Sequence, residues 1–130
     1  MASGTYERPV LDPGKENSLL GLGGISGTMR FEVPNSSTRY LVFSSGAQGG
    51  LLVIGGYGST YDNKAGVYII SCSNSGNISL PVIKAATYSG LTITPLSNTV
   101  IEIVNPGGYL WGTVLMVYGD KPTVATTQPT

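Results

Sequence analysis

The chain has 130 residues and no net charge, because seven Lys and Arg balance seven Asp and Glu, and only 11% of its residues are charged. This length gives room for one domain with a substantial hydrophobic core. The sequence has no histidine and one cysteine, Cys72. Nucleophile pairs that need histidine, internal disulfides, and zinc sites built from His or several Cys are therefore excluded. The lack of net positive charge also argues against nucleic-acid binding.

Charged residues are concentrated near the N-terminus, where Glu7, Arg8, Asp12, Lys15 and Glu16 lie close together. No signal peptide and no apolar run long enough to span a membrane is apparent, so we expect synthesis in the cytoplasm and no membrane insertion. The last residues of the sequence, 120–130, are rich in Thr and Pro, a composition that favours an extended chain. Because such tails are normally disordered unless something holds them, we expect a neighbouring chain to hold this tail. The predicted organisation is a polar attachment arm over 1–20, a Gly-rich hinge over 21–28, a body over 29–119 and an extended Thr/Pro tail over 120–130.

The body consists of short β-rich runs separated by Gly, Asn, Ser and Pro, and it shows no helical period. In chain order the eight runs are Met29–Val33, Thr38–Ser44, Gly50–Ile54, Gly66–Ser71, Ile78–Lys84, Leu91–Thr94, Val100–Val104 and Tyr109–Tyr118. Regularly spaced short strands with turn residues between them are typical of all-β sandwiches and barrels. We therefore predict a compact antiparallel β-sandwich of the jelly-roll kind, with a small closed barrel as the second choice.

The runs 50–54 and 109–118 are apolar on both faces. A strand in a two-layer sandwich normally has one face in solvent, so such runs imply a further burial partner. We expect a subunit interface in a homo-oligomer, most simply a trimer; the alternative is a pair of central strands covered by loops. The residues assigned to this interface are Leu52, Ile54, Trp111, Leu115 and Val117.

The segment 55–64 combines glycines with two tyrosines and several short polar residues. Tyrosine rings can stack on sugars, while hydroxyl, carboxylate and amide groups can bond to their hydroxyls, a mixture that suits glycan or protein recognition. The alternative is a Gly-rich turn in which the tyrosines are incidental. The predicted ligand-binding residues are Tyr57, Ser59, Tyr61, Asp62 and Asn63.

No motif in the sequence builds an active site. The stretch 21–27 has Ser26 where a dinucleotide-binding loop needs its third glycine. The body carboxylates Glu32 and Glu102 lie within β-rich runs, where a solvent-exposed strand face accounts for them. We therefore expect no enzymatic activity, no cofactor and no bound metal.

Six features of the sequence carry a resemblance to a known family: the polar arm, the hinge, the Gly/Tyr-containing last run and the runs Tyr40–Phe43, Leu51–Gly58 and Gly90–Thr94. In these features the sequence resembles the β-sandwich tip domains of phage tail or head fibres. The resemblance covers about residues 28–119 and is one of pattern and composition. It implies a trimeric, enzymatically inert virion protein that attaches to a larger assembly through its arm and contacts a host-surface glycan or protein. The chain lacks the repetitive shaft of a tail fibre, which favours a short fibre or a capsid decoration protein. A free-standing, monomeric microbial lectin is the other alternative.

Overall fold

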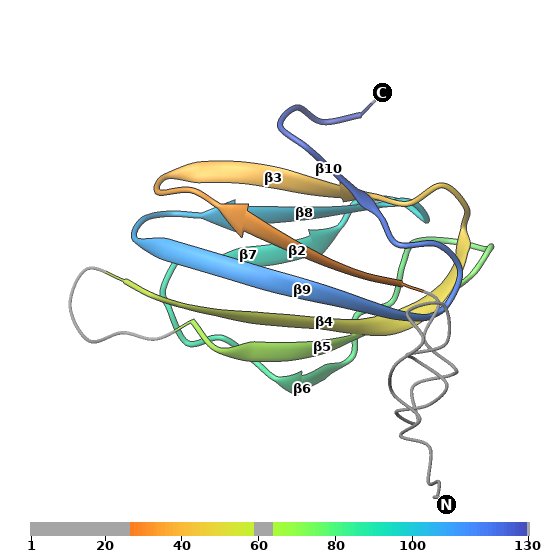
Figure 1. The fold of residues 1–130 in the computed structure, drawn as a ribbon, viewed down its shortest axis with the longest axis horizontal. Helices are drawn as coiled ribbons and strands as arrows, with labels where there is room; N and C mark the ends of the chain where they lie inside the picture. The colour runs from red at the N-terminus through yellow and green to blue at the C-terminus, as the bar shows by residue number, and fades with distance from the viewer. Residues whose placement is uncertain (1–26, 59–63, 130) are drawn as a thin grey trace, which may run out of the picture.

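The computed structural model describes residues 27–58 and 64–129, and their secondary structure consists of nine β-strands. The strands form two antiparallel sheets packed face to face (Figure 1), which confirms the predicted β-sandwich. The predicted arm over 1–20 lies outside the described residues. The predicted hinge ends within a strand, because Gly27 and Thr28 already pair with Met116 and Leu115.

The two sheets differ in size and in the order of their strands. The five-stranded sheet contains, side by side, β2 (Gly27–Val33), β9 (Tyr109–Tyr118), β4 (Ala47–Tyr57), β5 (Gly66–Ser73) and β6 (Val82–Lys84). The four-stranded sheet contains β10 (Thr123–Ala125), β3 (Ser37–Val42), β8 (Val100–Asn105) and β7 (Thr92–Pro95).

The core lies between the sheets and is filled by alternate residues of the strands, as a period of two requires. Gly112 also faces inward, where its lack of a side chain makes room for the Phe31 ring: a Cβ at Gly112 would lie 2.3 Å from the Phe31 Cζ atom. The fully buried apolar side chains come from both sheets: Val33, Leu41, Leu52, Ile70, Ile101, Ile103, Leu110, Val114 and Met116.

Each of the eight predicted runs contributes to the sandwich, but the run 78–84 forms a strand only over Val82–Lys84. Proline has no N–H for the ladder, and Pro81 divides this run. Before it, Ser79 makes an isolated bridge to Ser71, while the Pro81 carbonyl accepts a hydrogen bond of 2.8 Å from the Ile69 N–H. The interrupted segment therefore lies at the edge of the five-stranded sheet.

Part of the C-terminal tail pairs with another strand of the same chain. Residues Thr123–Ala125 pair with Val42, Leu41 and Tyr40 as β10 (Figure 1), and Pro122 just before them is fully buried. Within the predicted tail over 120–130, the structure forms a strand over Thr123–Ala125. Its partner was not foreseen, because an edge strand can accept any backbone with free N–H and C=O groups.

Deletion of residues 122–130 should lower the melting temperature by about 3–5 °C for each kcal/mol of edge pairing and Pro122 burial that is lost. We expect a loss of roughly 1–2 kcal/mol, since the strand pairing of three residues and the burial of one proline ring are lost. Thermal denaturation followed by circular dichroism measures it, with deletion of residues 127–130, beyond β10, as the control. A loss that depends on protein concentration would instead indicate a neighbouring chain.

Candidate ligand-binding face

The outer surface of the five-stranded sheet carries the second apolar face of β4 and of β9. Alternate residues of β4 and β9 point into the core, and the other half point to solvent. We call this surface the open face. Its side chains are those of Thr28, Arg30, Glu32, Leu51, Val53, Tyr57, Val67, Ile69, Tyr109, Trp111, Thr113, Leu115 and Val117, with Gly55 among them.

The predicted interface residues divide between the two sides of this sheet. Leu52 and Ile54 are 0% and 3% exposed and belong to the core, so they are not available to a partner. Trp111, Leu115 and Val117 do lie on the open face. Sequence alone could not separate the two sets on β4, because residues 51–54 are all aliphatic and only the packing decides which alternate set turns inward.

Three aromatic side chains form a row at one end of the open face. Tyr57 pairs with Tyr109 in the β4–β9 register, and their ring centroids are 5.0 Å apart. The Tyr109 ring is parallel to that of Trp111 within 7°, with 5.6 Å between centroids. The exposed fractions of Tyr57, Tyr109 and Trp111 are 51%, 49% and 37%. This aromatic row is a broad apolar surface that the fold leaves in contact with water.

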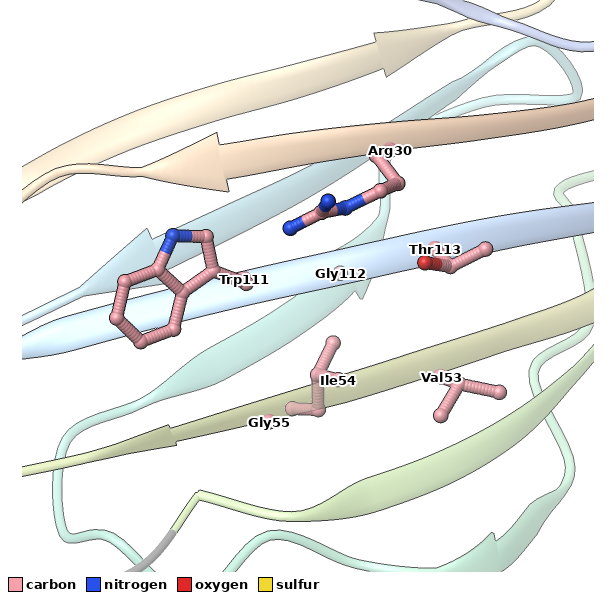
Figure 2. Close-up of a pocket in the computed structure, with 7 residues that line it drawn as sticks. All are labelled: Arg30, Val53, Ile54, Gly55, Trp111, Gly112 and Thr113. Atoms are coloured by element: carbon pink, nitrogen blue, oxygen red, sulfur yellow. The ribbon is translucent and has the colours of Figure 1, made fainter.

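Hollows lie on both sides of Trp111. Gly55 is opposite Trp111 in the β4–β9 register, and a Cβ at Gly55 would meet no atom within 4 Å. The hollow there has a volume of about 210 Å³ and is also lined by Arg30 and Val53. Figure 2 shows the face of the Trp111 indole ring turned toward the viewer. On the β2 side, a second hollow of about 300 Å³ is lined by Arg30, Glu32 and Trp111.

A third hollow continues the series at the end of the sandwich. It measures about 350 Å³ and is lined by Asn35, Tyr57, Gly58, Gly108 and Tyr109. The aromatic row thus has space beside Trp111 and beyond its tyrosine end. Small hollows next to exposed rings can hold ring-shaped ligands one unit at a time.

A buried lysine supports this end of the sandwich from within. The Lys64 side chain is fully buried, and its Nζ donates hydrogen bonds to Asn105 Oδ1 at 2.7 Å and to the Gly107 carbonyl. Nζ also lies 4.3 Å from the centre of the Tyr88 ring. Burial lowers the pKa of the Lys64 ammonium below its ordinary value. The Lys64 backbone N–H donates to the Gly56 carbonyl at 3.1 Å, which ties this point to β4.

The Asn105 side chain forms hydrogen bonds with three segments of the chain. Its Nδ2 group donates to the carbonyls of Val33, Pro34 and Gly108 at 3.0, 3.1 and 3.2 Å. The turn after β2, the turn before β9 and Lys64 are thereby joined, and Gly108 in the second of these turns directly precedes Tyr109. Sequence reasoning did not identify Asn105 or Lys64 as a pair, and no spacing signal would have, since 41 positions separate them.

The predicted ligand-binding loop is only partly described. Tyr57 is exposed and belongs to the aromatic row. Ser59, Tyr61, Asp62 and Asn63 lie outside the described residues. Tyr109, Arg30 and Glu32 were not among the predicted ligand-binding residues; the signal that could have found them is the alternation of β2 and β9, which places them on one surface with Trp111.

Comparison with family models, with curated proteins and with solved structures finds no match to this chain. In the part of the chain that the structure describes, no group of three or more His, Cys, Asp or Glu side chains could hold a metal ion. The same residues include no helix of the length and apolar character needed to cross a membrane.

Proposed function

We propose that this protein is a non-enzymatic recognition module that binds a glycan on a host surface through the aromatic row. The observation that carries the proposal is the exposed series Tyr57, Tyr109 and Trp111 with hollows beside it. Aromatic rings offer a rigid apolar surface for the faces of sugar rings and lose little conformational entropy on binding. The neighbouring hollows leave room for the sugar hydroxyls.

The setting that we propose is a virion surface, with the module displayed in several copies and attached through residues 1–20. The support for this setting is the resemblance of the sequence to fibre-tip domains. Weak single sites would then act together through multivalency. The half of the open face away from Tyr57 and Tyr109 supports self-association, because Leu51, Ile69, Leu115 and Val117 make an uncharged apolar surface there.

Substitution of Trp111 by alanine should weaken glycan binding at least tenfold, which corresponds to a loss of about 1.4 kcal/mol. The measurement is binding to a glycan array, followed by adhesion of the labelled protein to host cells. Tyr118→Ala is the matched control, because Tyr118 is 64% exposed on the same strand at the end away from the aromatic row. Circular dichroism should show both variants folded, since neither side chain belongs to the core cluster.

Several outcomes would contradict the glycan proposal. If Trp111→Ala binds as strongly as the native chain, the aromatic row is not the site. If the native chain binds no glycan and particles that carry it gain stability without gaining adhesion, the protein is a capsid decoration protein. Binding to a host protein, sensitive to Trp111 but not to competing sugars, would change the class of ligand.

A further inference from the structure

We infer that the ligand of the open face is an uncharged oligosaccharide, one sugar ring of which lies on Trp111 while adjacent hydroxyls bind between Arg30 and Glu32. This inference rests on the proposed function and names the class of glycan. It is carried by the placement of two opposite charges beside the indole ring of Trp111.

Arg30 and Glu32 are two residues apart on β2, so both side chains point to the open face. Glu32 is directly opposite Trp111 in the β2–β9 register, and Arg30 is opposite Thr113. Arg30 lines the hollows on both sides of the indole. Figure 2 shows its guanidinium directed along β9 toward Trp111.

The two charged groups have complementary hydrogen-bonding roles. A guanidinium only donates and an ionised carboxylate only accepts, whereas each sugar hydroxyl can do both. Neighbouring hydroxyls of one ring can thus accept from Arg30 and donate to Glu32. Within the described residues neither side chain forms an ion pair or a hydrogen bond, so both groups are available to a ligand. Hydrogen bonds to charged groups are about twice as strong as those between neutral groups.

The charge balance of the site selects against acidic and basic ligands. A carboxylate or sulfate on a sugar would gain from Arg30 but would meet the like charge of Glu32, and a cationic ligand would meet the reverse conflict. The chain as a whole has no net charge to draw either kind toward the surface. A neutral polyhydroxyl ligand satisfies both side chains without such a penalty.

The dimensions point to a chain of sugars rather than a single one. The hollows beside Trp111, of about 210 and 300 Å³, are at or below the low end of the roughly 300–1,000 Å³ typical of sites for drug-sized ligands, which suits one ring each. The aromatic row then continues to Tyr109 and Tyr57, where the third hollow lies. Successive sugars of an oligosaccharide can occupy these positions in turn.

The test compares soluble neutral oligosaccharides of glucose, galactose and mannose with sialylated and uronic-acid-containing oligosaccharides by isothermal titration calorimetry. We expect binding to a neutral member, with affinity at least tenfold lower in Arg30→Ala and in Glu32→Ala. Glu32→Gln should bind acidic oligosaccharides better than the native chain does, because it removes the repelling charge and keeps the shape. Asp120→Asn, an exposed carboxylate away from the open face, is the matched control.

The outcomes separate this inference from the proposed function. If acidic oligosaccharides bind and neutral ones do not, or if neutral binding needs Trp111 but is unchanged in Arg30→Ala and Glu32→Ala, the inference is overturned while glycan recognition stands. If no oligosaccharide binds and cell adhesion ignores Trp111→Ala, the proposed function fails and the inference fails with it.

Discussion

Replacement of Asn105 by alanine should lower the free energy of unfolding by roughly 3 kcal/mol, because each buried polar group left without its partner costs about 1–3 kcal/mol. The variant loses one of the two acceptors of the Lys64 ammonium, since only the Gly107 carbonyl remains. It also loses the donors that bond to the Val33, Pro34 and Gly108 carbonyls. A buried charge and buried carbonyls without partners are costly because no water replaces the lost bonds.

Urea denaturation followed by circular dichroism measures this loss, and Asn77→Ala, in an exposed turn, is the matched control. The double variant Lys64→Met/Asn105→Leu should be more stable than Asn105→Ala, because it removes the buried charge together with its acceptor. An Asn105→Ala variant as stable as Asn77→Ala would mean that this network contributes nothing to the fold. Weaker glycan binding in Asn105→Ala is also expected, since Asn105 bonds to Gly108 in the turn that directly precedes Tyr109.

Substitution by alanine should greatly lower the free energy of unfolding at one of two adjacent glycines of β4 and leave it almost unchanged at the other. Gly56 has a φ of +154°, and a Cβ there would lie 2.0 Å from the Tyr109 carbonyl oxygen, a backbone atom of the paired strand. Strain at this φ and the clash with β9 should together cost roughly 3–5 kcal/mol. The pairing of Tyr57 with Tyr109 should loosen as well, because Gly56 lies next to it.

Gly55→Ala is the control for this prediction and a probe of the site at the same time. A Cβ at Gly55 meets no atom within 4 Å, so stability should change by less than about 0.5 kcal/mol, as for most surface substitutions. The added methyl group narrows the hollow beside Trp111, and glycan binding should weaken without loss of fold. Thermal denaturation and calorimetric titration of both variants measure the two effects. Equal stability of Gly55→Ala and Gly56→Ala would contradict the described close approach of β4 to β9.

Local residue patterns were enough to predict eight of the nine described strands and the two-layer architecture. Alternation of apolar and polar residues marks β2, and Asn-Pro-Gly-Gly at 105–108 marks the turn into β9. These signals act over a few residues, so they survive without knowledge of the fold. The sequence also led us to predict that Tyr57 binds a ligand and that Trp111 lies in an interface, and both side chains are exposed in the structure. Their relation to Tyr109 could not be predicted, because cross-strand neighbours are set by register.

Thus the sequence by itself determined the class of fold, the absence of histidine chemistry and the neutral, weakly charged surface. Tertiary structure decided which half of each doubly apolar strand faces water, since Leu52 and Val53 differ in packing and not in character. It also brought Lys64 to Asn105 and the tail to β3. The physical reason is the same in each case, because burial and backbone pairing join residues that are far apart along the chain. The free energy gained from burial or pairing depends on the partner that a residue meets and not on the residue alone.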